Sequence, residues 1–138
     1  MSTLTEIQKM LSKFTLNGSF ETNRKTTLKT IPSELDNYGV YFFTEKDNDD
    51  EKIVYIGKSG TMNQNGEFGK QTLRKRIMKG KKKKEWLSKN NYKVYWYVTS
   101  ENKCSKCSEN IPAVVECSLL KKYYELNKGK LPKYNNAF

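Results

Sequence analysis

Two runs of apolar, β-branched and aromatic residues stand close together in the middle of the chain. They are Gly39–Phe43 (GVYFF) and Ile53–Gly57 (IVYIG), and residues of these types are typical of strands. We expect strands over about 39–44 and 52–57, joined as an antiparallel hairpin. The polar stretch between the two runs (TEKDNDDEK) has the length of a longer hairpin loop.

The remaining periodicity predicts another strand and several helices. Between residues 92 and 99 the side chains alternate with the period of two that a half-buried strand shows. A capping box at Thr3 and apolar residues at helical spacing predict a helix to about Phe14. Further helices are expected over about 70–79, with a turn or two more after Lys84, and over about 112–126, where a proline occupies the first turn.

Residues 15–37 form a polar extension ahead of the first predicted strand. Asn17-Gly18 is a turn signal within it, and Ile31-Pro32 marks an extended boundary. A chain of 138 residues is long enough for one hydrophobic core. We therefore expect an N-terminal helix with a polar extension over 1–37 and one main domain over 38–138.

The chain carries a large excess of positive charge. It has 26 Lys and Arg residues against 15 Asp and Glu, a formal net charge of +11. Such an excess favours a polyanionic partner, through neutralisation of phosphates and release of counterions. No stretch approaches the roughly 20 apolar residues of a membrane-spanning helix, and no signal-peptide pattern follows Met1. We expect a cytoplasmic protein that binds nucleic acid and not membranes.

The absence of histidine limits the chemistry that the chain can perform. Histidine is the usual general base near neutral pH and the commonest ligand of transition metals. Catalysis would have to use tyrosine, lysine or carboxylate, and any metal should be one that prefers oxygen. Cys104 and Cys107 form a C-x-x-C pair, but zinc takes about four ligands and only Cys117 remains. We expect no metal at these cysteines.

The strings Gly39-Val40-Tyr41 and Tyr55-Ile56-Gly57 resemble, in order and spacing, the signature of the GIY-YIG nuclease family, with valine in place of the first isoleucine. The resemblance covers about residues 38–136. It implies an α+β fold with a small three-stranded antiparallel sheet flanked by helices, to which this chain adds a short N-terminal helix. Gly39 and Gly57 are expected to support the active site.

Glu116 stands out in the last predicted helix. Its neighbours three and four positions away are all apolar, so the carboxylate should face the packed side of that helix. Because burying an unpaired charge is costly, such a residue snorkels, stays neutral or holds a cation. A glutamate exposed at the rim of the helix is the alternative. The family keeps one metal-binding glutamate on this helix, and the resemblance therefore implies that Glu116 binds Mg²⁺ or Mn²⁺.

The arginine that would hold the scissile phosphate is a choice between two. Arg74 and Arg76 flank opposite sides of the stripe formed by Leu73 and Ile77, so periodicity does not separate them. The helix of the family reads aliphatic-x-x-Arg-aliphatic, which implies Arg76. A solvated basic helix is the alternative, and it suits Arg74 and Lys75.

The tyrosines are the candidates for handling protons. The resemblance implies that Tyr41 deprotonates or orients the attacking water and that Tyr55 positions the water or the phosphate. Tyrosine ionises near pH 10, so it needs nearby cations to stabilise the phenolate. A metal on Glu116, together with Arg76 and Lys58, would act in that direction. Two tyrosines that pack their rings in a strand are the alternative.

Three further positions follow from the resemblance or qualify it. Many members carry a histidine or tyrosine four residues after the arginine, and here that position is Gly80. Lys58, directly after the second string, is the candidate substitute, with an ordinary phosphate contact or a solvated lysine as the alternative. Asn135 matches the asparagine that ties the C-terminus of these nucleases to the catalytic sheet.

The basic residues around the arginine are expected to follow a phosphate backbone. These candidate nucleic-acid-binding residues are Arg74, Lys75, Lys79, Lys81, Lys82, Lys83 and Lys84.

Taken together, the charge and the resemblance imply a metal-dependent endonuclease that hydrolyses DNA, of a restriction-like or phage type. Two alternatives stay open: a catalytically inactive DNA-binding module, and an RNA-cleaving or toxin-like nuclease of the same fold. One short chain supplies one active centre, so a homodimer is expected if both strands of a duplex are broken.

Overall fold

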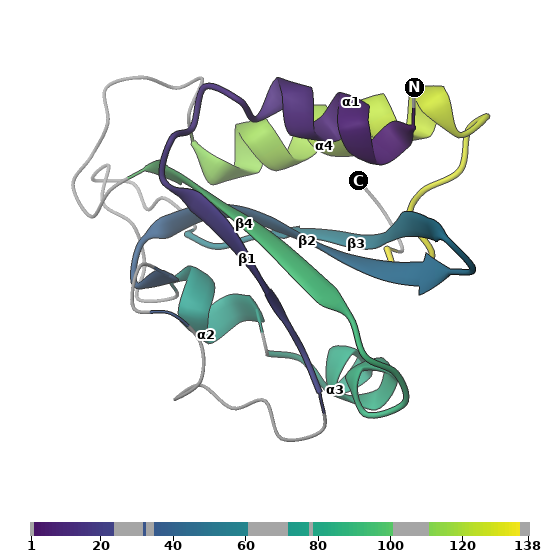
Figure 1. Cartoon of the computed structure of the whole chain (residues 1–138). Helices are drawn as coiled ribbons and strands as arrows, with labels where there is room; N and C mark the ends of the chain where they lie inside the picture. The colour runs from purple at the N-terminus through teal and green to yellow at the C-terminus, as the bar shows by residue number, and fades with distance from the viewer. Residues whose placement is uncertain are drawn as a thin grey trace.

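A four-stranded antiparallel sheet with the strand order β1-β4-β2-β3 lies at the centre of the protein (Figure 1). The structure is a computed structural model, and it describes residues 2–23, 32, 35–60, 72–77, 79–100 and 111–135. The fold is α+β. Its elements are α1 (Thr3–Met10), β1 (Asn17–Glu21), β2 (Tyr38–Asp47), β3 (Asp50–Lys58), α2 (Leu73–Ile77), α3 (Lys81–Leu87), β4 (Lys93–Ser100) and α4 (Pro112–Leu126).

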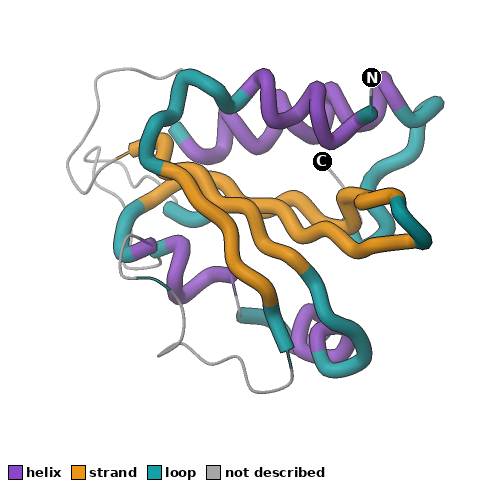
Figure 2. The backbone as a smooth tube through the Cα atoms, in the orientation of Figure 1, coloured by secondary structure: helices purple, strands orange, loops and turns teal. Residues whose placement is uncertain are grey.

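Helices cover both faces of the sheet. Helices α1 and α4 lie side by side on one face, and α2 and α3 lie on the other (Figures 1 and 2). Successive residues of a strand point to opposite faces, so β2 contributes to two buried clusters. Tyr41 and Phe43 pack towards α2 and α3, while Val40 and Phe42 pack towards α1 and α4. This double burial explains why β2 is a continuous apolar run.

The hairpin between β2 and β3 is longer and tighter than the sequence predicts. The two strands pair as far as Asp47 and Asp50, and Asn48 takes a φ of 60° in the turn. The expected longer loop is therefore wrong. Glu45 lies opposite Lys52 in the register, and Lys46 lies opposite Glu51. Such cross-strand pairs of opposite charge stabilise a ladder, which lets a polar stretch continue both strands.

The expected three-stranded sheet is also wrong, because β1 adds a fourth strand. It pairs with β4, with Gly18 opposite Trp96. A Cβ added at Gly18 would lie 2.6 Å from the Trp96 ring, so this glycine permits a close approach and does not form the predicted turn. Residues 17–21 thus join the same sheet, and Ile7 and Leu11 of α1 belong to the same core cluster as Leu119 of α4.

The helices largely follow the predicted pattern. Helix α4 begins at Pro112 and is followed by Asn127 as its C-cap, as the sequence indicates. Helix α1 ends at Met10, earlier than predicted, and α2 covers part of the predicted 70–79. Within the described ranges, no helix is long and apolar enough to cross a membrane.

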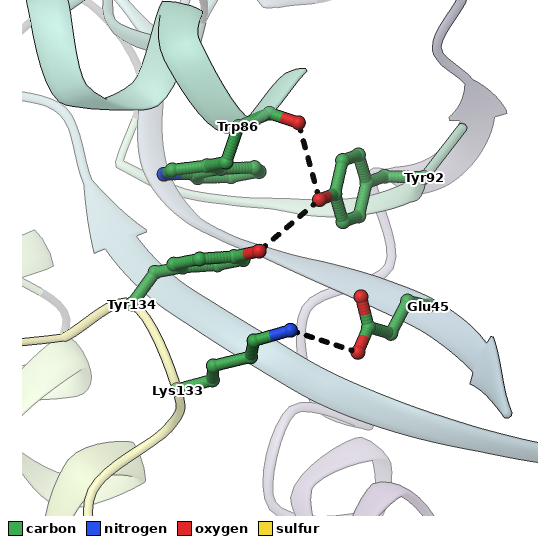
Figure 3. A network of polar contacts seen from close by, with 5 residues as sticks. All are labelled: Glu45, Trp86, Tyr92, Lys133 and Tyr134. Atoms are coloured by element: carbon green, nitrogen blue, oxygen red, sulfur yellow. Dashed lines mark hydrogen bonds and ion pairs between the residues drawn. The ribbon is translucent and has the colours of Figure 1, made fainter. Parts of the chain in front are cut away.

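The C-terminal segment, with Tyr134 and Asn135, returns to the sheet and packs against both β3 and α3. Asn135 accepts a hydrogen bond from the Ile56 N–H and donates one to the Ile56 carbonyl, both at 2.9 Å. This is the tie to the sheet that the sequence predicts for Asn135. The Tyr134 ring stacks on Trp86 of α3, with centroids 4.5 Å apart and planes 1° from parallel (Figure 3). The Tyr92 hydroxyl donates to the Trp86 carbonyl at 3.2 Å.

Candidate functional site

Tyr41 lies at the centre of the candidate site, in the middle of β2. It is 0% exposed and stands opposite Gly57 in the register with β3. A Cβ at Gly57 would lie 2.5 Å from Tyr41 Cζ and 2.6 Å from its Oη. Only a residue without a side chain leaves room for the phenol at this position. The Tyr55 ring packs beside that of Tyr41, with centroids 6.1 Å apart, and Tyr55 is half-buried.

Gly39 supports the site from the backbone. A Cβ there would lie 2.0 Å from the carbonyl oxygen of Tyr97 in β4. The pairing of β2 with β4 shifts register between Tyr38 and Gly39. The Ser59 N–H donates to the Gly39 carbonyl at 2.9 Å, just after β3 ends. Gly39 therefore lets three backbone segments meet beside the tyrosines.

The structure separates the two arginines of α2. Arg74 Nη1 lies 3.7 Å from Asp36 Oδ2, before β2. Arg76 has an exposed side chain, and its charge acts on Tyr41, Tyr55 and Glu116. Of the two arginines, Arg76 is the one whose charge lowers the pKa values of Tyr41 and Tyr55.

Glu116 comes from α4 and is half-buried. Burial raises the pKa of Glu116, while the positive charges of Lys58 and Arg76 oppose that shift. By the alternation of β3, Lys58 points to the face of the sheet that α4 covers, as Ile56 does. In the described part of the chain, no side chain forms an ion pair or hydrogen bond with the Glu116 carboxylate. Its negative charge is therefore offset by Lys58 and Arg76 without a direct contact.

The site is built around the edge strand β3. Tyr41, Tyr55 and Arg76 belong to the face covered by α2 and α3, whereas Glu116 belongs to α4 on the opposite face. The charge of Glu116 nevertheless raises the pKa of both tyrosines. Because β3 is the last strand of the sheet, side chains from the two faces can meet around its edge. The five predicted catalytic residues are thus brought into one electrostatic neighbourhood.

The environment of Tyr41 differs from what the sequence predicts. Burial raises the pKa of Tyr41 well above its ordinary value, Tyr55 and Glu116 raise it further, and Arg76 opposes the shift. Burial also raises the pKa of Tyr55. The protein's own charges therefore do not make a phenolate of Tyr41. Of the two tyrosines, Tyr55 is the one that solvent can reach.

Lys83 is the functional candidate that the sequence reasoning missed. It was expected on the nucleic-acid-binding surface, but it is only 6% exposed, so that assignment is wrong. Its Nζ lies 2.7 Å from Tyr41 Oη and 3.1 Å from the Arg76 carbonyl oxygen. A signal was present, because Lys83 precedes the buried Trp86 by three positions and shares its face of α3.

The other basic residues remain candidates for contacts with nucleic acid. Lys75, Lys79, Lys81, Lys82 and Lys84 are exposed on or beside α2 and α3. These helices cover the same face of the sheet (Figure 1), so their lysines give that face a positive charge. Cys104 and Cys107 lie outside the described residues. Cys117 is a free, exposed cysteine.

No protein-family model, curated protein or solved structure matches this chain.

Proposed function

We propose that this protein is a metal-dependent endonuclease of the GIY-YIG type that hydrolyses phosphodiester bonds of DNA. The observation that carries the proposal is that Tyr41 and Tyr55 pack at Gly57, within reach of the charges of Arg76 and Glu116. Perturbed ionisable groups held together in this way are typical of functional sites. A pair of tyrosines that only packed its rings would not require an exposed arginine and a desolvated carboxylate beside it.

Arg76 suits the binding of the scissile phosphate. Its guanidinium is exposed yet acts on the buried tyrosines, and arginine binds phosphate oxygens with paired, charge-assisted hydrogen bonds. In the transition state it would offset the negative charge that develops on the phosphoryl oxygens. Lys58, at the end of β3, would add a second positive charge on the side of Glu116.

Glu116 fits the role of a metal ligand. Mg²⁺ is commonly held by one or two carboxylates, with water and substrate phosphate completing its shell. Among the described residues no cluster of three or more His, Cys, Asp or Glu side chains exists, so a metal here would rest on Glu116 and the substrate. The raised pKa of Glu116 reflects a carboxylate that gains from a cation. Bound there, Mg²⁺ would act as a Lewis acid that stabilises the leaving oxygen.

The tyrosine pair suits the activation of the attacking water. Tyr55 is half-buried whereas Tyr41 is fully buried, so we assign the contact with water to Tyr55 and a supporting position to Tyr41. This reverses the order that the sequence resemblance implies. The water oxygen would attack phosphorus in line with the leaving oxygen, while Arg76 holds the phosphate.

DNA is the preferred substrate class, and two alternatives remain outcomes of the test. The net charge of +11 and the exposed lysines of α2 and α3 favour a nucleic acid. An inactive binding module would bind DNA without cutting it. An RNA-cleaving nuclease would use the same residues on a different backbone.

To test this proposal, cleavage by the purified protein is measured on supercoiled plasmid, a DNA duplex and a structured RNA. Each substrate is tried with Mg²⁺ and with a chelator. We expect both DNA substrates to be cut in Mg²⁺ and none in chelator, because the chemistry needs a cation at Glu116. DNA that is bound but never cut would support the binding module. RNA cut in preference to DNA would support the RNA-cleaving nuclease. Linear plasmid as the first product would indicate a dimer on DNA, and nicked circles a monomer.

A further inference from the structure

Lys83 is a buried amine that no contact with a carboxylate explains. Its Nζ donates to Tyr41 Oη at 2.7 Å and to the Arg76 carbonyl at 3.1 Å. It also lies 4.9 Å from the ring centroids of both Tyr41 and Tyr55. A buried lysine normally has an acidic partner, and none of the described residues forms an ion pair with this one.

Helix α3 holds Lys83 firmly in this position. Trp86, one turn further along α3, packs edge-to-face on Phe43 at 5.1 Å and on Tyr92 at 4.9 Å. Tyr134 covers the other side of the Trp86 ring, and Tyr92 bonds the Trp86 carbonyl (Figure 3). The amine is therefore directed at Tyr41 by a packed aromatic cluster and not by a flexible loop.

The groups that face Lys83 disfavour its charged form. They are the Tyr41 hydroxyl from β2, the Tyr55 ring from β3, and the carbonyl and guanidinium of Arg76 from α2. Burial, with the Arg76 charge as a second cause, lowers the pKa of Lys83 from 10.5 to about 7. The amine can therefore be neutral, and able to accept a proton, at the pH of the cell.

Tyr41 connects Lys83 to Tyr55. The rings of Tyr41 and Tyr55 lie side by side, with centroids 6.1 Å apart, and each tyrosine alters the pKa of the other. We propose that Tyr55, Tyr41 and Lys83 form a proton chain that runs from the attacking water to the buried amine. This inference rests on the proposed function and adds Lys83 to it as a positioning residue. It supplies the acceptor that Gly80 cannot provide.

The proton transfers and bond changes of the proposed hydrolysis balance with water and solvent protons alone. One O–H bond of the water breaks and its proton goes to Tyr55, whose own proton goes to Tyr41, whose proton in turn goes to Lys83 Nζ. The water oxygen bonds to phosphorus, and the bond from phosphorus to the leaving oxygen breaks with its electron pair on that oxygen. The leaving oxygen takes a proton from solvent, and the Lys83 ammonium returns one to solvent.

This arrangement predicts the direction of the pH dependence. The proton chain can pass a proton to Lys83 only while the Lys83 amine is neutral, which requires a pH above its pKa of about 7. Below that pH the cleavage rate should fall about tenfold per pH unit, because the neutral fraction falls in that proportion. Above it, the rate should level off.

The experiment compares cleavage rates at saturating DNA with the titration of Lys83, followed by NMR of ¹³C-labelled lysine. The Lys83 signal is identified by its absence in Lys83→Met. We expect a midpoint near pH 7 and a loss of about a hundredfold in rate for Lys83→Met. Lys83→Arg should be as slow, since arginine keeps the charge but cannot accept a proton. Tyr41→Phe removes the hydroxyl that links Tyr55 to Lys83, so its cleavage rate should no longer fall about tenfold per pH unit below about pH 7. Lys89→Met, which removes an exposed charge just after α3, should keep both rate and profile.

Three results would overturn the chain: a Lys83 midpoint near 10.5, a wild-type rate in Lys83→Arg, or an unchanged pH profile in Lys83→Met. A wild-type protein that cuts no nucleic acid contradicts the proposed function itself. The two failures are therefore distinguishable, because only the second is an absence of cleavage by the wild type.

Discussion

Arg76→Ala is expected to lower the rate of DNA cleavage by about a hundredfold or more while leaving DNA binding nearly intact. In the proposed reaction the guanidinium offsets charge that develops only in the transition state, and single donors of this kind contribute about 10²–10³ in rate. Binding depends instead on many dispersed lysines. Single-turnover cleavage at saturating protein measures the first quantity, and a filter or anisotropy titration of the same duplex measures the second.

Arg74→Ala is the matched control on the same helix. Arg74 lies beside Asp36, so its loss should reduce the rate by less than about threefold. Arg76→Lys should recover part of the lost rate, since it restores charge without the paired hydrogen bonds. A large loss in Arg74→Ala with a normal rate in Arg76→Ala would mean that Arg74, and not Arg76, binds the phosphate.

Gly57→Ala is expected to damage both stability and activity. The new methyl group would stand 2.5 Å from Tyr41 Cζ, and Tyr41 is fully buried between β3 and α3, so the ring has no free space to enter. Overpacking of this kind costs about 1–3 kcal/mol. Urea denaturation should show that loss, and cleavage should fall because the phenol of Tyr41 is displaced from Lys83.

A double-mutant cycle identifies the cause of that damage. In a Tyr41→Leu background the side chain no longer reaches over Gly57, so Gly57→Ala should cost much less free energy of unfolding than it does in the wild type. An equal cost in the two backgrounds would place the origin of the effect in the backbone of β3 and not in the contact with Tyr41.

Local pattern predicted the elements that are strongly apolar or strongly periodic. The runs at β2 and β3 and the alternation at β4 are confirmed as strands, and α4 begins and ends where its proline and asparagine indicate. Strand β1 was missed because Phe20 is the one large apolar side chain in it. Its stability comes from pairing with β4, which is tertiary information. The extended hairpin was missed because its charge pairs exist only once the register is set.

The candidate site was predictable in its residue types but not in its electrostatics. Periodicity could not separate Arg74 from Arg76, since the answer depends on the position of Asp36. Lys83 stands in a run of lysines, so its burial was not predicted. That burial follows from the packing of Trp86 on Phe43 and Tyr134. The raised pKa of Tyr41 follows from the burial of its side chain beneath α2 and α3, which a single sequence does not reveal.

In the function proposed above, Glu116 holds the cation required for cleavage of DNA. The most direct test is the single-turnover cleavage rate of one duplex over a range of Mg²⁺ concentrations, in Glu116→Gln and in Glu125→Gln, an exposed position on the same helix. The wild type and Glu125→Gln should show the same saturable dependence on Mg²⁺. Glu116→Gln should be slower by about a hundredfold or more, without recovery at high Mg²⁺. A Glu116→Gln protein that cuts at the wild-type rate with the wild-type dependence on Mg²⁺ would show that Glu116 does not hold the cation.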